Sequence, residues 1–153
     1  MTRTTFQAVL AAFTLSLPAC NSATPFEVIE TVTFAPGLGI DLTQMTRLPS
    51  GVYIQDLVVG TGTVMAVGHH VSVQLTGWIR NGTQWTSGVL SFDYGVTDFG
   101  VDGFAIGIEG MAVGGTRLII VPPELGYGEL PPPDSGIPKG AILIYEVDLL
   151  VSG

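Results

Sequence analysis

Apolar and polar residues alternate along much of this chain, and the alternation predicts a protein built mainly from β-strands. The pattern is cleanest over residues 71–78. One face of that strand carries its apolar and small residues: Val71, Val73, Leu75 and Gly77. Further segments have the composition of strands: residues 26–34, 52–58, 92–95 and 117–121. We therefore expect several short strands before the end of the chain.

A long final strand is predicted over residues 141–151. One of its faces carries alternate apolar side chains: Leu143, Tyr145, Val147, Leu149 and Val151. The dipeptide Asn81-Gly82 predicts a two-residue hairpin turn after the strand of residues 71–78. The one helix candidate covers residues 102–111, with Asp102 as the candidate N-cap, and its glycines keep it short. These elements predict an α+β fold, a twisted antiparallel sheet with little helix.

Length and composition predict one domain with enough hydrophobic residues to form a core. The 153 residues are 46% hydrophobic and only 12% charged, and the formal net charge is −8. Because phosphate binding needs clustered Lys and Arg, we expect no nucleic-acid partner. The single cysteine excludes an internal disulfide framework.

The first residues have the pattern of an export signal. Residues 1–19 contain Arg3, an apolar stretch over residues 6–17 and then small residues, and they are too short for a normal membrane span. The cysteine, Cys20, ends a Leu-Pro-Ala-Cys run that resembles a lipobox, so we expect Cys20 to carry lipid. Because Asn21 and not aspartate follows, we expect an outer-membrane anchor in a cell envelope, with the domain facing the periplasm. Plain secretory cleavage nearby is the alternative.

Residues 107–129 are the most constrained segment of the chain. A short β-branched strand over residues 116–121 ends at Pro122-Pro123, because proline cannot donate a backbone hydrogen bond. Two glycines then flank Tyr127 and fix the direction of its ring. An aromatic side chain held by such a shaped loop is typical of a functional site.

This segment resembles the hallmark of the FKBP family of peptidyl-prolyl cis-trans isomerases. The matching residues are Gly110, Met111, Gly114, Pro122, Pro123, Tyr127 and Gly128. Residues 137–150 resemble the family's final strand, and residues 73–77 stand where the family has Val-x-Tyr-Thr-Gly. The resemblance covers residues 51–153 and implies a sheet wrapped around the one helix. It leaves residues 1–19 as signal peptide and residues 20–50 as lipid anchor, tether and N-terminal strand.

Other kinds of chemistry have no support in the sequence. No activated Ser or Cys nucleophile with a positioned base is suggested. The two histidines, His69 and His70, are adjacent in a predicted loop and would point in opposite directions, which makes a poor metal site. Prolyl isomerisation needs neither, because an apolar pocket with a few hydrogen-bond donors is sufficient. We therefore expect no cofactor and no metal.

The resemblance implies roles for individual residues. As catalytic groups it implies the Tyr127 hydroxyl and the Val101 amide as donors, Phe104 as the pocket floor, and Trp85 and Tyr145 as walls. As substrate-binding residues it implies a second set: Leu75, Thr86, Leu90, Phe92 and Ile137. Phe92 and Phe104 could equally be plain core residues of a small sheet domain.

Two departures from the family pattern bear on activity. Leu75 stands where the family has a tyrosine, and Thr86 stands where it has an aspartate. In relatives this polar pair shapes the pocket and engages macrolide ligands. We expect reduced activity or changed specificity, and a larger effect on inhibitor binding than on catalysis.

Three functional hypotheses remain open at this point. The first is a monomeric, lipid-anchored isomerase that acts on X-Pro bonds of exported polypeptides. The second is a non-catalytic module that binds proline-containing or unfolded segments through the same pocket. The third is a structural envelope lipoprotein with a decayed pocket.

Overall fold

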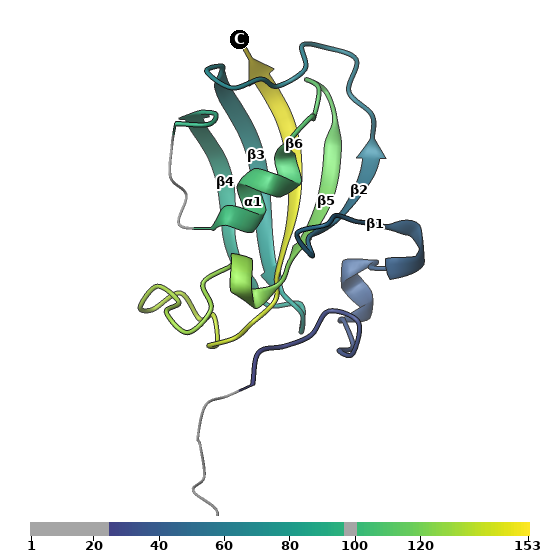
Figure 1. Ribbon diagram of the computed structural model, residues 1–153, viewed down its shortest axis with the longest axis vertical. Coiled ribbons are helices and arrows are strands. Elements are labelled where there is room, and N and C mark those ends of the chain that lie inside the picture. Colours follow the sequence, from purple (N-terminus) through teal and green to yellow (C-terminus); the bar gives the residue numbers. More distant parts are fainter. Residues whose placement is uncertain (1–24, 97–100) are drawn as a thin grey trace, which may run out of the picture.

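The computed structural model describes residues 25–96 and 101–153, and it shows an antiparallel sheet that curls around one short helix (Figure 1). The predicted signal peptide and Cys20 lie outside the described residues. The strands are β1 (Thr46–Arg47), β2 (Tyr53–Val58), β3 (His70–Ile79), β4 (Gln84–Asp93), β5 (Thr116–Val121) and β6 (Leu143–Ser152). They form one 6-stranded sheet in the order β1-β2-β5-β6-β3-β4. The predicted fold class is confirmed.

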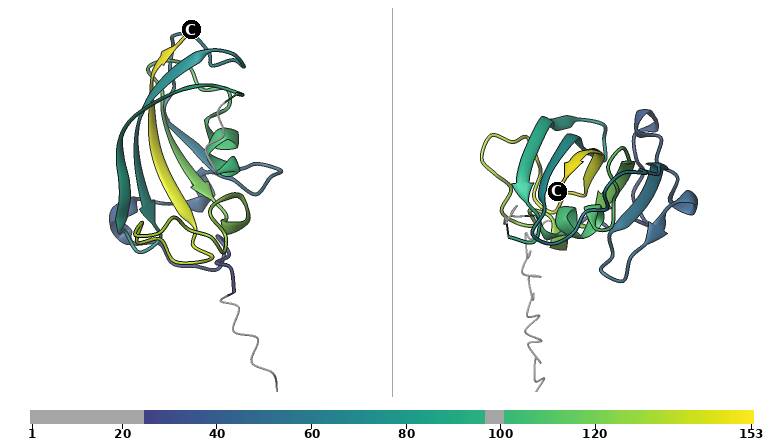
Figure 2. Two further views of the ribbon diagram at one scale, coloured as in Figure 1. Left: turned by 90° about the vertical axis from the view of Figure 1, so that its left-hand side faces the viewer. Right: turned by 90° about the horizontal axis from the view of Figure 1, so that it is seen from above.

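The concave face of this sheet holds the main core, and helix α1 (Asp102–Ile108) packs against it (Figure 2). The alternation predicted for β3 is confirmed, because Val71, Val73 and Leu75 are all buried. Phe104 and Ile108 of the helix belong to the same core cluster. The functional site is built on this face.

Helix α1 approaches the sheet closely because glycines face β5. A Cβ at Gly103 would lie 2.3 Å from Cγ1 of Val121, and one at Gly107 would lie 2.4 Å from Cγ2 of Ile119. The helix ends at Ile108, earlier than predicted, and its N-cap is Val101. The assignment of Asp102 as the cap is therefore wrong, because Asp102 is the first helical residue.

Arg117 on β5 holds the C-terminal end of the helix. Its Nη1 donates to the carbonyl oxygens of Gly107 and Glu109, both at 2.9 Å. Its Nε donates to Asp56 on β2 at 2.6 Å. Since the last carbonyls of a helix lack partners within it, this buried guanidinium satisfies them and ties the helix to two strands.

The hairpin predicted at Asn81-Gly82 is present between β3 and β4, with a slightly longer loop. Ile79 donates its N–H to the carbonyl of Thr83 at 3.0 Å, and Gly82 donates to Ile79 at 2.9 Å. Gly82 has a φ of 88°, in the left-handed region that favours glycine. The loop therefore spans residues 80–82, which is a hairpin with one left-handed residue at its end.

The inward face predicted for the last strand holds only as far as Leu149. Val73 pairs with Leu149 while the preceding residue, Ser72, pairs with Val151, so Leu150 is an extra residue on β6. Such a bulge reverses the side-chain direction beyond it. Val151 is accordingly 52% exposed and Ser152 only 8% exposed, so the prediction was wrong for Val151.

The strand predicted over residues 26–34 is absent. This segment is irregular and leads into two short 3₁₀ helices, η1 (Pro36–Leu38) and η2 (Leu42–Gln44). Three of its apolar side chains, Ile29, Val32 and Phe34, instead cover the convex face of the sheet. There they join a second core cluster: Ile29, Val32, Phe34, Leu38, Ile40, Leu42, Met45, Tyr53, Trp78, Leu118, Ile120, Ile142 and Ile144. The apolar and polar residues alternate here because one side of the segment packs on the sheet, although the segment is not itself a strand.

Candidate functional site

A cavity of about 250 Å³ opens on the concave face between β3, β4, α1 and the loop that follows β5. Most residues predicted for the site line it: Leu75, Trp85, Thr86, Leu90, Val101, Phe104, Tyr127 and Tyr145. A cavity of this size suits one side chain with its flanking peptide groups and is smaller than most sites for drug-sized ligands.

Aromatic rings in mutual contact form the walls. The ring of Trp85 lies edge-on to that of Tyr127, with centroids 6.0 Å apart and an interplanar angle of 81°. It meets Tyr145 in the same way at 5.6 Å and 78°. Tyr145 in turn contacts Phe104 at 5.2 Å. Edge-to-face contacts at these distances are favourable and fix the rings relative to one another.

A β-bulge in β4 places two side chains on the same side of the sheet. Gly77 pairs with Thr86, but the next residue, Trp78, pairs with Gln84, so Trp85 is the extra residue on β4. Trp85 and Thr86 both line the cavity, although consecutive residues of a regular strand would face opposite ways. Bulges are frequent beside active sites because they redirect a side chain in this manner. Sequence reasoning could not locate the bulge.

Gly77 provides the space that these side chains occupy. It pairs with Thr86 on one side and with Tyr145 on the other. A Cβ at Gly77 would lie 2.7 Å from Cγ2 of Thr86 and 3.0 Å from Cε2 of Trp85. Because glycine has no side chain, Trp85 and Tyr145 can meet above the backbone of β3.

The loop that carries Tyr127 follows β5 and the short 3₁₀ helix η3 (Pro123–Leu125). Gly128, directly after Tyr127, has a φ of 51°, and its N–H donates to the carbonyl of Pro123 at 3.1 Å. The carbonyl of Gly128 accepts from the N–H of Gly140 at 2.8 Å. This loop geometry directs the ring of Tyr127 into the cavity.

Both tyrosine hydroxyls of the site are neutral at physiological pH. Desolvation by burial raises the pKa of Tyr127. Desolvation also raises the pKa of Tyr145 well above its usual range, and the neighbouring Tyr127 adds to the effect. Within the described part of the chain, neither hydroxyl has a hydrogen-bond partner. Each can therefore donate to a bound ligand.

Two residues that line the cavity each carry an N–H group without a partner in the described structure. Val101 caps α1, and its N–H donates to no acceptor among residues 25–96 and 101–153. Nε1 of Trp85 is buried and is likewise without a partner in this part of the structure. An unpaired buried N–H is costly and uncommon.

Two residues predicted to bind substrate do not line the cavity. Phe92 and Ile137 are 4% and 7% exposed and pack within the main core. Conversely, Ser87, Gly88 and Val89 line the cavity but were not predicted. Gly88 lies opposite Leu75 in the sheet, so the register of β4 against β3 would have identified it.

The two histidines lie outside this cavity and contact different partners. Nδ1 of His69 lies 2.8 Å from Oγ of Ser152, and Nδ1 of His70 lies 2.8 Å from Oδ1 of Asp93. Among the described residues, no cluster of His, Cys, Asp and Glu is arranged to hold a metal ion. None of the helices in the described ranges is long and apolar enough to cross a membrane.

The chain thus combines a curled antiparallel sheet around one helix with an aromatic cavity between them. The family model for the FKBP-type peptidyl-prolyl cis-trans isomerase matches residues 62–150, which is more than half of the chain. This chain therefore belongs to the FKBP-type peptidyl-prolyl cis-trans isomerase family.

Similar sequences support the family assignment. An FK506-binding protein of Neisseria meningitidis serogroup B is 37% identical over 107 residues, which cover 65% of this chain and 94% of the relative. FK506-binding protein 4 of Dictyostelium discoideum is 34% identical over 109 residues, covering 69% of this chain. The match spans only 29% of the Dictyostelium protein's length.

Solved structures show the same fold. The crystal structure of AtFKBP13 covers 71% of this chain with a TM-score of 0.65 and 27% sequence identity, and 98% of its own chain is matched. The N-terminal domain of FKBP42 from Arabidopsis thaliana covers 74% of this chain and is itself 94% matched, with a TM-score of 0.66 and 21% identity.

Proposed function

We propose that this protein catalyses cis-trans rotation about X-Pro bonds of exported polypeptides. The observation that carries the proposal is the cavity itself, in which Trp85, Tyr127, Tyr145 and Phe104 enclose an apolar space with neutral hydroxyl donors at its wall. Membership of an isomerase family supports it.

The chemistry requires no covalent step. Resonance across the amide produces a rotation barrier of about 18–20 kcal/mol, so the uncatalysed reaction takes tens to hundreds of seconds. The twisted transition state has lost that resonance and is less polar than the planar amide. A cavity that removes water from the amide therefore stabilises the twisted form relative to the planar one.

Hydrogen-bond donors then hold the substrate in place. We assign the Tyr127 hydroxyl and the Val101 N–H to carbonyl groups that flank the bound proline, because both line the cavity and neither is used within the described structure. The Trp85 and Phe104 rings would contact the proline ring. Burial keeps Tyr127 protonated and so keeps it a donor.

The test is a peptide isomerisation assay on the chain from residue 21 to residue 153. We expect faster cis-to-trans conversion of a short Ala-Pro peptide at micromolar protein, and a modest decrease in rate for Tyr127→Phe. No increase over the uncatalysed rate would refute the proposal.

A non-catalytic binding module is the second candidate, and the wall opposite Tyr127 favours it. Leu75 and Thr86 line the cavity where the family pattern has a polar pair. A cavity without that pair could hold a proline-containing segment without turning it over. Peptide binding or suppression of aggregation without isomerase activity would identify this function, whereas absence of both would leave only a structural role.

We also propose that the protein is exported and anchored by lipid on Cys20, with the domain in the cell envelope. The support is the sequence pattern of residues 1–20 alone. Labelling with a fatty-acid analogue tests the proposal, because label should enter the wild-type chain and be absent from Cys20→Ser.

A further inference from the structure

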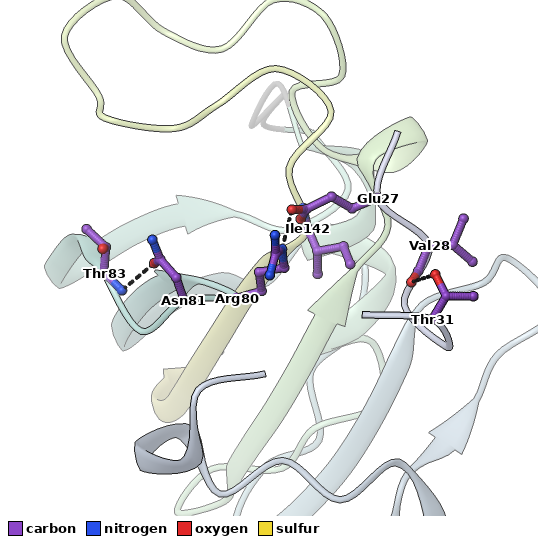
Figure 3. Close-up of polar contacts among 7 residues, drawn as sticks. All are labelled: Glu27, Val28, Thr31, Arg80, Asn81, Thr83 and Ile142. Carbon is purple, nitrogen blue, oxygen red and sulfur yellow. Dashed lines mark hydrogen bonds and ion pairs between the residues drawn. The ribbon is translucent and has the colours of Figure 1, made fainter. Parts of the chain in front are cut away.

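Glu27, in the segment that precedes the family match, contacts two parts of the domain: the hairpin loop at Arg80 and the segment of residues 140–142 that leads into β6. Figure 3 shows the contacts of its carboxylate with Arg80 and Ile142. Its Oε1 accepts a hydrogen bond from Nε of Arg80, and its Oε2 accepts one from the backbone N–H of Ile142 at 3.0 Å. The N–H of Glu27 donates to the carbonyl of Gly140 at 3.0 Å. Both carboxylate oxygens and the backbone of one residue are thus used.

Two of these contacts lead directly to walls of the cavity. Arg80 begins the hairpin loop between β3 and β4, and β4 carries Trp85. Ile142 immediately precedes β6, which carries Tyr145. Glu27 therefore contacts the hairpin loop that leads into β4 and the residue that precedes β6, the two strands whose aromatic rings meet above Gly77.

The third contact leads to the Tyr127 loop. Gly140, which accepts from Glu27, donates its own N–H to the carbonyl of Gly128 at 2.8 Å. The ring of Phe26 lies across the same two glycines, because a Cβ at Gly140 would be 3.0 Å from its Cδ1 and one at Gly128 would be 3.6 Å from its Cζ. The residue next to Gly128 is Tyr127.

The pair of Glu27 with Arg80 is less exposed than the pair of Glu30 with Arg47. The side chain of Glu27 is 24% exposed and that of Arg80 is 43% exposed. In the same segment, Glu30 and Arg47 are 47% and 57% exposed, and Glu30 bonds to Tyr53 on the convex side of the sheet. Because water screens exposed pairs most, the pair of Glu27 with Arg80 is less screened than that of Glu30 with Arg47.

We infer that Phe26 and Glu27 form a latch that positions the Tyr127 loop against the Trp85 wall, which makes Glu27 a positioning residue for the cavity. The inference deepens the proposed function and rests on it. The latch adds no group to the cavity, so it acts on the fraction of molecules in which the cavity is correctly formed. A lower fraction weakens apparent substrate binding in proportion and leaves the bound complex unchanged.

The test compares Glu27→Ala with Glu30→Ala in the full chain, because both remove a glutamate from the same segment. The first readout is amide hydrogen exchange at Gly140, which reports the hydrogen bond to Gly128 without any need for activity. We expect exchange at Gly140 to be about tenfold faster in Glu27→Ala, as for local opening of a loop, and unchanged in Glu30→Ala.

The second readout separates KM from kcat for a short X-Pro peptide. In Glu27→Ala we expect KM to rise about fivefold while kcat stays within about twofold of the wild type, following the population argument. Arg80→Lys keeps the positive charge and should restore most of the affinity lost in Arg80→Ala. If Glu27→Ala does not fold, Glu27→Gln replaces it. Exchange at Gly140 and KM should then change in the same direction but by less.

The outcomes separate the latch from the proposed function. Unchanged exchange at Gly140 in Glu27→Ala, or equal effects of Glu27→Ala and Glu30→Ala, would overturn the latch. If the wild type has no isomerase activity, the proposed function fails. In that case KD for the peptide replaces KM, and a KD that does not change in Glu27→Ala would again overturn the latch.

Discussion

Trp85 and Tyr145 meet at 5.6 Å above a residue that has no side chain, Gly77. The three residues lie on three neighbouring strands, and the contact depends on the bulge that turns Trp85 inward. This contact joins two walls of the cavity.

Gly77→Ala should therefore damage the site as well as the fold. The new methyl group would lie 2.7 Å from Thr86 and 3.0 Å from the Trp85 ring, so both side chains must move. We expect a loss of about 1–3 kcal/mol in unfolding free energy, as for other overpacked positions. Urea denaturation measures this, and Trp85 fluorescence in a Trp78→Phe background reports the displaced ring.

Gly88→Ala is the matched control for the fluorescence, since Gly88 also lines the cavity but a Cβ there would meet no atom within 4 Å. Its φ of 153° strains any other residue, so the substitution should cost some stability. It should nevertheless leave the Trp85 emission unchanged. An unshifted Trp85 emission in Gly77→Ala would contradict the packing described above.

Restoring the polar pair should strengthen macrolide binding. Leu75 lies opposite Gly88 and Thr86 lies diagonally from it on β4, a separation that a tyrosine side chain can span. We expect Leu75→Tyr with Thr86→Asp to bind FK506 at least about tenfold more tightly than the wild type, which corresponds to about 1.4 kcal/mol. Calorimetry measures the affinities.

Each single substitution should increase the affinity for FK506 less than the two substitutions together. A lone buried hydroxyl or carboxylate is left without its partner and costs free energy on burial. Additive gains from the two single variants would show that the two side chains do not act as a pair.

Arg117→Met should destabilise the fold while the ring contacts of the cavity persist. The substitution removes two hydrogen bonds to the end of α1 and the pair with Asp56. We expect a loss of about 2–3 kcal/mol in unfolding free energy, measured by urea denaturation. Asp56→Asn should cost less, because the Asp56 side chain is 41% exposed and water can replace its contacts. Equal costs would indicate that the ion pair, and not the helix end, carries the stabilisation.

Stability should fall in alkali because of the buried tyrosines. Burial raises the pKa of Tyr145 and Tyr127 in the folded state above the usual value near 10. The unfolded chain therefore loses these protons first, and unfolding becomes more favourable as pH rises above about 10. Below that pH both residues are neutral in both states and contribute no pH dependence. In Tyr145→Phe, the unfolding free energy should decrease less steeply as pH rises above about 10. An unchanged dependence on pH in that variant would show that Tyr145 does not cause the decrease.

Much of the fold could be predicted where a strand has one buried face, as β3 does, or where turn residues bound an apolar run, as they do for β5. Alternation located β3 well, and the run from Thr116 to Val121 was correctly bounded by its glycines and prolines. The same signal failed for residues 26–34, because apolar side chains that cover a sheet from outside alternate as readily as those within it. It failed for Val151 because a bulge depends on the partner strand.

Site residues could be predicted where neighbouring residues in the sequence fix the direction of a side chain. They were harder to predict where strand register fixes it. Tyr127 was identified from its loop, and the structure places it in the cavity. Phe92 and Ile137 were assigned to the same cavity but are packed in the core. The role of Gly77 and the contacts of Glu27 depend on segments far apart in sequence, and no local pattern contains them.

The proposed function requires that this cavity lower the barrier to rotation about an X-Pro bond. Exchange NMR of an Ala-Pro peptide with a small amount of the protein observes that rotation directly, without a coupled reaction. We expect cis-trans exchange peaks that appear only with protein, that weaken in Tyr127→Phe, and that disappear when a competing ligand fills the cavity. A peptide that binds, as shown by shifted signals, and yet has no exchange peaks would contradict the claim.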